Sequence, residues 1–201
     1  MTRKHWLTIA AAIIGIVVGG VAGNTIWNAT PTHAKSHQVS PQPTTKWHGL
    51  PQVDTNFMEQ ILHAKVENIQ GKTITLANAK KPILFSAPFC PWCAKTEKLL
   101  VANHLMGKVQ IVGVALNGGS KDVPFPSMQV TNVKQAQAVF ARDWKYYGIH
   151  WATANFNFAM PGSLIDQVIQ RYPFFLIPHE GKWYADMGYN PSIKFWKSIL
   201  G

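Results

Sequence analysis

The chain has 201 residues, a hydrophobic content of 47% and a formal net charge of +10. This length accommodates one domain of ordinary size plus additional segments, and the apolar fraction is sufficient for a core. The lysines are scattered rather than striped, and no nucleic-acid motif accompanies them. The charge therefore indicates a solvated basic surface, suited to an anionic membrane or wall, rather than a nucleic-acid-binding face.

The chain begins with a short basic head, which is followed by an apolar stretch from Leu7 to Gly23. This pattern predicts either a cleavable signal peptide or an uncleaved anchor. As a helix at ~1.5 Å per residue, the span from Trp6 to Trp27 would measure about 31 Å and match a bilayer core. A tryptophan at each end favours the anchor, although Val21-Ala22-Gly23 is an acceptable cleavage site. The positive-inside rule then places the rest of the chain outside the cytoplasm, as a single-pass protein of the cell membrane. Signal cleavage would instead give a secreted or periplasmic protein.

The chain divides into three expected parts: a signal-anchor helix at 1–27, a flexible linker at 28–50 and a folded domain at 51–201. The linker is rich in Thr, Pro, Ser, His and Gln and lacks apolar periodicity. In the domain, strand-like and helix-like patterns alternate. The elements expected in chain order are a helix around 57–62, a hairpin over 66–76, a strand at 82–87, a helix to about 103, a strand at 109–116, a helix over 136–147, a short strand within 151–160, a helix over 161–171, a strand, turn and strand over 172–187, and a closing helix from about 192.

The only two cysteines lie in Phe89-Cys90-Pro91-Trp92-Cys93, between the apolar run at 82–87 and a helix-like run. A C-x-x-C pair at a strand-to-helix junction is typical of a redox site. Cys90 would begin the helix, where unpaired N–H groups and the positive end of the helix dipole favour a thiolate. Pro91 suits the first turn, because its missing N–H would have no partner there. Cys90 is therefore the candidate nucleophile and Cys93 the candidate resolving thiol, and the two would form a redox-active disulfide.

Two other interpretations of the cysteine pair compete with a redox site. Half of a zinc site would need two more ligands from the eight histidines, and none of these forms a tight H-x3-H pair near the cysteines. A purely structural disulfide would constrain the unfolded chain little, because so short a loop contributes only about 2 kcal/mol. We favour the redox pair over both. No metal ion or organic cofactor is then expected, because the dithiol/disulfide couple carries the electrons.

From about residue 66 to 201, the chain resembles the thioredoxin-like superfamily. The C-P-W-C opens a helix after an apolar strand, Pro173 begins a later strand, and a hairpin and a terminal helix follow. The hairpin at 68–76 and the extra helix before Pro173 look more specifically like the TlpA/ResA branch of membrane-anchored thiol–disulfide oxidoreductases. The resemblance implies an α/β fold, with a central mixed sheet flanked by helices, an N-terminal hairpin and an inserted helical segment.

The resemblance also implies roles for residues around the cysteines. Pro173, preceded by Tyr172, would be cis and would lie against the pair, where it shapes a substrate groove together with Pro91 and the exposed Trp92.

The chain departs from the family pattern at several positions. Phe89 replaces the usual tryptophan, Phe174 follows the proline where thioredoxins often have threonine, and Leu84 stands where thioredoxin has a buried carboxylate. Glu97, one turn beyond the pair, is expected to point to solvent. The site is therefore expected to have no acid nearby, and no proton-transfer residue is assigned.

The implied function is thiol–disulfide exchange with protein substrates outside the cytoplasm, with a membrane redox partner that recycles the cysteine pair. The branch favours a reductant, as in cytochrome c maturation. The dipeptide between the cysteines does not fix the direction, so a disulfide-forming oxidase of the DsbA type stays open. A copper- or haem-handling thiol chaperone is an alternative from another class, in which Met128, Met160 and Met187 could add soft ligands. A redox-inert binding module is a third.

Overall fold

In the computed structural model of the chain, residues 46–118, 128–150 and 156–201 are described. They belong to a compact unit that covers Pro41–Gly201. The expected anchor at 1–27 and most of the expected linker lie outside the described residues. Among the helices that are described, none combines the length and the apolar character needed to cross a bilayer.

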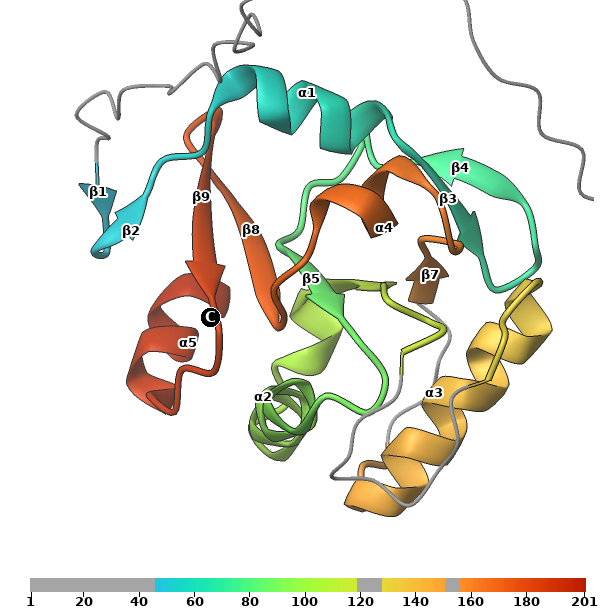
Figure 1. The fold of residues 1–201 in the computed structure, drawn as a ribbon. Coiled ribbons are helices and arrows are strands. Elements are labelled where there is room, and N and C mark those ends of the chain that lie inside the picture. Colours follow the sequence, from blue (N-terminus) through green and yellow to red (C-terminus); the bar gives the residue numbers. More distant parts are fainter. Residues whose placement is uncertain (1–45, 119–127, 151–155) are drawn as a thin grey trace, which may run out of the picture. The chain divides into compact units, whose positions relative to one another are not determined.

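The described part is built on a seven-stranded mixed sheet with the order β4-β3-β7-β6-β5-β8-β9 (Figure 1). Strands β5, β6 and β7 run parallel, whereas β8, β9, β3 and β4 pair antiparallel with their neighbours. The parallel centre is apolar, as expected for strands covered on both faces. The strands are β3 (Lys65–Asn68), β4 (Thr73–Thr75), β5 (Ile83–Ser86), β6 (Gln110–Gly113), β7 (Phe156–Phe158), β8 (Phe174–His179) and β9 (Lys182–Met187).

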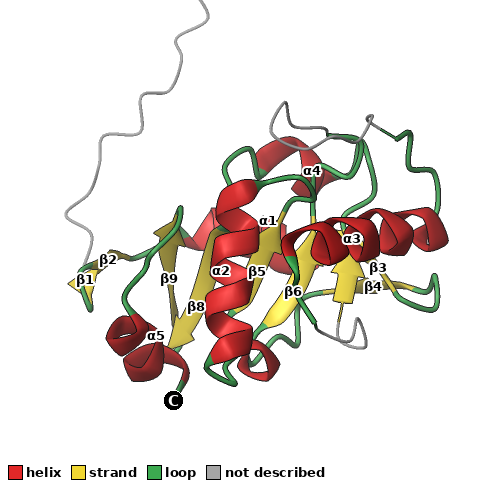
Figure 2. Cartoon of the chain, turned by 90° about the horizontal axis from the view of Figure 1, so that it is seen from below, coloured by secondary structure: helices red, strands yellow, loops and turns green. Residues whose placement is uncertain are grey.

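Helices cover both faces of the sheet. Figure 2 shows α2, α3 and α5 in front of the sheet, with α1 behind it. Side chains of α1 and α4 pack in one core and those of α2, α3 and α5 mainly in the other. The helices are α1 (Thr55–His63), α2 (Pro91–Ala102), α3 (Val133–Tyr147), α4 (Leu164–Val168) and α5 (Ile193–Leu200), with a short 3-10 turn at Met106–Lys108.

The helices begin where short polar side chains satisfy their first N–H groups. Asp54 accepts the N–H of Phe57 at the start of α1. Asn132 does the same at α3 and Ser192 at α5. These caps fix where each helix starts, and the apolar spacing along each helix fixes which face is buried.

Alternation along the strands divides the apolar residues between the two faces. On β8, Phe175 and Ile177 point to the core under α3 and α5, whereas Phe174 and Leu176 point to the core under α1 and α4. On the neighbouring strand β5, Leu84 is fully buried in the first of these cores. The sheet thus separates two apolar layers, and the mixed sheet flanked by helices agrees with the predicted fold class.

Residues 46–50 differ from the prediction, because they are folded rather than part of a flexible linker. They form β1 (Lys46–Trp47) and the start of β2 (Leu50–Pro51), which pair antiparallel. The Trp47 ring stacks on His179 at a centroid distance of 4.2 Å and lies 5.3 Å from Tyr184. The partners of Trp47 lie more than 130 residues away along the chain, so local composition gave no sign of this packing.

The other expected elements are present, with one clear difference in length. The helix expected over 161–171 is only Leu164–Val168, because Ser163 caps it and Ile169 already has an extended backbone. The helix also has to end before Tyr172, since the residue directly before Pro173 is disfavoured in the helical region. Of the region expected to contain a short strand, 156–158 forms β7, and 151–155 lies outside the described residues.

Helix α3 and strand β7 together form an insertion between β6 and Pro173. The helix lies so close to the sheet that a Cβ on Gly113 would meet Phe140 Cε2 at 2.7 Å. The Phe140 and Trp144 rings contact Phe156 of β7 at centroid distances of 4.7 and 5.4 Å. This packing brings the last turns of α3 to the loop that carries the cysteines.

Candidate active site

The cysteine pair lies at the end of β5, as predicted. Cys90 is the N-cap of α2, and its Sγ accepts the N–H of Cys93 at 3.2 Å. Pro91 opens the helix, where no N–H is needed. Cys90 is half-buried, whereas Cys93 is only 1% exposed, so a partner protein can reach the first sulfur but not the second.

The surroundings separate the two thiols in acidity. The thiol hydrogen bond from Cys93 lowers the pKa of Cys90 most, and the N–H groups of Cys93 and Trp92 lower it further, against burial and the charge of Asp143. Burial raises the pKa of Cys93 well above its ordinary value, and its hydrogen bond to Cys90 adds to this effect. Cys90 is therefore the sulfur that forms a thiolate first.

The predicted cis proline faces this sulfur. The Tyr172–Pro173 peptide is cis, and the carbonyl oxygen of Tyr172 lies 3.8 Å from Cys90 Sγ. Pro173 itself is buried, and β8 begins directly after it. The structure thus brings together two segments that the sequence predicts as one site.

Trp92 forms an exposed lip beside Cys90. Its side chain is 53% exposed and stacks with Tyr189 at a centroid distance of 6.0 Å. The Nζ of Lys95 lies 4.1 Å from the centre of the Trp92 ring. The lip therefore combines a flat aromatic surface with a positive charge.

Glu97 contradicts the expectation that it points to solvent. Its side chain is 1% exposed. The hydroxyl of Ser86 donates to Oε1 at 2.6 Å, and the indole N–H of Trp144 donates to Oε2 at 2.7 Å. Burial raises the pKa of Glu97 to about 8, although both hydrogen bonds oppose this rise. The carboxyl is therefore mostly protonated at neutral pH.

The two partners of Glu97 fix where its proton resides. Trp144 Nε1 is only a donor, so Oε2 must always accept. Ser86 both donates and accepts, so its hydroxyl can reverse when Oε1 is protonated. Glu97 also follows Cys93 by four residues on α2, which places both side chains on the same side of the helix. The site thus contains a buried, mostly protonated carboxyl one turn from Cys93.

A second buried acid, Asp143, holds the residue before Cys90. Phe89 has a φ of 61°, which is costly for a bulky side chain. Its N–H donates to Asp143 Oδ1 at 3.0 Å, and the Arg142 guanidinium lies 5.2 Å from the Phe89 ring centre. Burial raises the pKa of Asp143, which is 1% exposed, to about 6.

The expectation of a site without an acid is therefore wrong. Leu84 does occupy the strand position as an apolar residue, but the acids come from two helices instead. Spacing after Cys93 could have indicated Glu97, because i and i+4 share a helix face. No local pattern indicates Asp143, which lies 54 residues from the N–H that it accepts.

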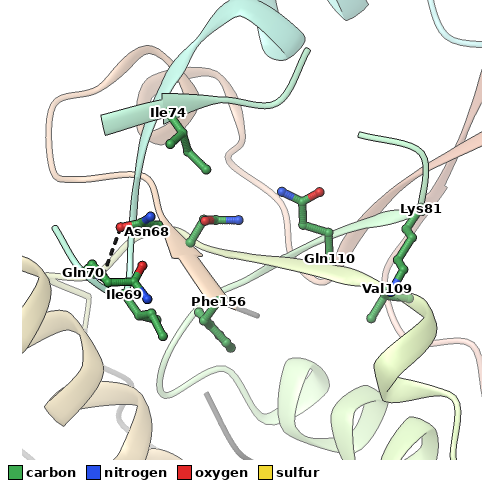
Figure 3. A pocket seen from close by; sticks show the side chains of 9 residues that line it. Asn68, Ile69, Gln70, Ile74, Lys81, Val109, Gln110 and Phe156 are labelled. Atoms are coloured by element: carbon green, nitrogen blue, oxygen red, sulfur yellow. Dashed lines mark hydrogen bonds between the residues drawn. The ribbon is translucent and has the colours of Figure 1, made fainter. Parts of the chain in front are cut away.

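The structure also contains cavities away from the thiols. A cavity of about 360 Å³, shown in Figure 3, is lined by Asn68, Gln110 and Phe156 among others. Gln110 and Phe156 are the first residues of the parallel strands β6 and β7, whereas Cys90 follows the last residue of β5. This cavity therefore lies at the opposite end of the parallel strands from Cys90. Met187 and Met160, considered as soft metal ligands, line two separate cavities. Within 46–118, 128–150 and 156–201, no group of three or more His, Cys, Asp or Glu side chains could hold a metal ion.

The sheet order, the cysteine pair at the start of α2 and the facing cis proline fit a thioredoxin-like fold. No protein-family model matches the chain. The search of curated proteins also found no match.

Three solved structures are similar to the chain, each at 16% identity. StoA from Bacillus subtilis matches with a TM-score of 0.40, over 66% of this chain and 92% of its own. The thioredoxin domain of a thiol-disulfide oxidoreductase from Bacteroides vulgatus matches with 0.41, over 70% and 96%. A protein from Chlorobium tepidum, assigned as a thiol:disulfide interchange protein DsbE, matches with 0.43, over 68% and 92%. At this level of similarity, the function is inferred from the chain's own residues.

Glu97 should make the free energy of unfolding of the wild type fall as pH rises. Replacing Glu97 with Gln should remove this fall. The pKa is about 8 in the folded protein and about 4.3 in an unfolded chain. Because the folded state holds the proton more tightly, the stability from this group is fully present below about pH 4 and is lost as pH rises through about 8. Relative to E97Q, the wild type should lose up to about 5 kcal/mol of unfolding free energy over this range.

The measurement is guanidinium unfolding of the reduced full-length protein at pH 5, 6.5 and 8. Gln keeps the shape of the side chain and can still accept from Trp144 while donating to Ser86. Glu59→Gln on the exposed side of α1 is the control, and it should not change the pH dependence. A constant difference between wild type and E97Q at all three pH values would mean that Glu97 titrates normally.

Proposed function

We propose that this protein is a thiol–disulfide oxidoreductase that acts on protein substrates. The observation that carries the proposal is the difference between the two sulfurs. Cys90 is accessible and has a lowered pKa, whereas Cys93 is buried and has a raised pKa. A nucleophile that partners can reach and a protected resolving thiol are what disulfide exchange requires.

In the reducing direction, the Cys90 thiolate attacks one sulfur of a substrate disulfide. A mixed disulfide forms between Cys90 and the substrate, and the other substrate sulfur leaves as a thiolate. The Cys93 sulfur, once deprotonated, then attacks Cys90, which forms the Cys90–Cys93 disulfide and releases the second substrate thiolate. The substrate gains two electrons and two protons, and the cysteine pair loses them.

The ionised form of Glu97, a minority at neutral pH, is the group that we expect to take the proton from Cys93. Cys93 needs a base because burial makes its thiol a weak acid. Burial raises the pKa of the carboxyl to about 8, which brings it closer to the pKa of the buried thiol than an ordinary carboxyl would be and makes the transfer less unfavourable. Glu97, at the end of the second turn of α2, would thus take the proton-transfer role that the apolar Leu84 on β5 cannot fill.

The substrate is expected to bind across the Cys90 sulfur, between the carbonyl of Tyr172 and the Trp92 lip. An extended segment of the substrate would lie beside Pro173. Trp92 and Tyr189 offer apolar area to that segment at little cost in side-chain entropy.

Replacing Cys93 with Ser should trap the mixed disulfide. Cys90 would still attack a substrate disulfide, but no second thiol would release it. Incubation of full-length C93S with a protein that contains a reducible disulfide should give a covalent adduct that dithiothreitol dissociates, detected by mass spectrometry. Cys90→Ser is the matched control and should give none.

The same experiment separates the proposal from a copper- or haem-handling chaperone. Stoichiometric Cu(I) binding by the wild type, without adducts in C93S, would favour the chaperone and overturn the oxidoreductase. Adducts that form equally with C90S would show nonspecific exchange through either sulfur.

We further propose that the protein works as a reductant. Like the branch it resembles, it would reduce disulfides outside the cytoplasm, such as those of cytochrome c precursors, and a membrane partner would recycle it. The buried position of Cys93 supports this direction, since burial raises its pKa well above the ordinary value and so disfavours its thiolate. A destabilised thiolate shifts the couple toward the disulfide, which makes the dithiol a better electron donor.

The direction is measured as the reduction potential of the Cys90–Cys93 couple, by equilibration of the full-length protein with defined glutathione or dithiothreitol mixtures. We expect a value well below about −220 mV, toward the thioredoxin end of the range. A value near about −120 mV would instead indicate a disulfide-forming oxidase.

We also propose that residues 1–27 anchor the protein in the cell membrane, with 51–201 outside the cytoplasm. The basic head and the tryptophans at both ends of the apolar stretch support this arrangement. In a bacterial host, the full-length protein should stay with the membrane fraction after carbonate washing, and a protease added to spheroplasts should degrade the domain. Release of a shortened chain into the soluble fraction would indicate signal cleavage.

A further inference from the structure

The insertion formed by α3 and β7 reaches the redox site through its last turns. Trp144 holds Glu97, and the preceding residue, Asp143, holds Phe89. The two side chains start one residue apart on α3 and contact opposite sides of the cysteine loop: the helix after it and the turn before it. This insertion therefore determines part of the environment of both sulfurs.

We propose that Asp143 is a positioning residue for the redox reaction, which holds the turn at Phe89 and Cys90 and biases the cysteine couple toward the disulfide by its negative charge. This inference rests on the proposed function. It adds a residue whose role neither the cysteine motif nor the cis proline implies.

The first part of the role follows from the backbone at Phe89. A φ of 61° is unfavourable for this side chain, so the turn needs an interaction to hold it. The hydrogen bond from Phe89 N–H to Asp143 Oδ1, at 3.0 Å in a buried place, supplies that interaction. Cys90 follows immediately, so the direction of its sulfur toward the Cys93 N–H depends on the same turn.

The second part follows from charge. The groups around Asp143 are Arg142 on its own helix, Glu97 on α2 and Cys90 at the start of α2. Arg142 favours the ionised form of Asp143, and Glu97 is mostly protonated at neutral pH, so Asp143 carries the negative charge of this buried pair. A nearby anion disfavours the Cys90 thiolate and raises its pKa. The disulfide carries no charge and is not disfavoured.

Two variants separate position from charge. Asp143→Asn keeps an oxygen that can accept the Phe89 N–H but removes the charge, whereas Asp143→Ala removes both. Asp54→Asn is the matched control, because Asp54 Oδ1 also accepts a backbone N–H at 3.0 Å, at the start of α1. All are made in the full-length protein, and two quantities are measured: thiolate absorbance at 240 nm against pH, and the equilibrium with glutathione at pH 7.

In D143N, the Cys90 thiolate should form at lower pH than in the wild type. The equilibrium constant for forming the disulfide should fall at least about threefold, which corresponds to about 15 mV toward a weaker reductant. D143A should show the same shift and, in addition, a slower reaction of Cys90 with a disulfide reagent, which D143N restores to the wild-type rate or above. D54N should match the wild type in every measurement.

A D143N protein with the thiolate titration and equilibrium constant of the wild type would overturn the proposal. So would equal shifts in D143N and D54N, which would indicate a general effect of losing a carboxylate. If D143A does not fold, D143N alone decides. A wild type without a reversible couple would remove the proposed function itself, whereas a reversible wild-type couple with an unchanged D143N would remove only the role of Asp143.

Discussion

The site depends on the two hydrogen bonds that hold the buried carboxyl of Glu97. An ionisable group enters an apolar interior only where hydrogen bonds replace the water that it loses. Glu97 meets this condition through Ser86 at the end of β5 and Trp144 near the end of α3. One side chain therefore ties together the strand that precedes the cysteines, the helix that carries them and the inserted helix. If α3 lay elsewhere, Oε2 would lose its donor in a buried place.

The close approach of α3 to the sheet makes this arrangement possible. Gly113 leaves room for Phe140, and the aromatic side chains of α3 and β7 fill the space beside it. The insertion is thus more than an addition at the edge of a thioredoxin-like sheet. It supplies Asp143, which accepts the Phe89 N–H just before the cysteines, and Trp144, which donates to Glu97 just after them.

The two buried acids show how the surroundings of a carboxyl determine whether it holds a proton or a negative charge. Burial raises the pKa of both, but Glu97 reaches about 8 and Asp143 only about 6, where Phe89 N–H and Arg142 favour its charge. At neutral pH, one acid therefore holds a proton and the other holds a charge. Carboxyls whose surroundings separate their pKa values in this way commonly divide proton transfer from electrostatic tuning.

The sequence by itself determined the cysteine motif at a strand-to-helix junction, most of the element order and the proline that faces the pair. The first two follow from local patterns, the spacing of two cysteines and apolar periodicity, whereas the role of Pro173 was implied by the resemblance to the thioredoxin-like superfamily. It did not determine the acids or the packing of residues 46–50. Glu97 looked like a solvent-facing helix residue because its indole partner lies 47 positions away, and Asp143 acts on an N–H 54 positions away. Whether a carboxyl is buried depends on which distant donors reach it, so only the tertiary structure decided the electrostatics of the site.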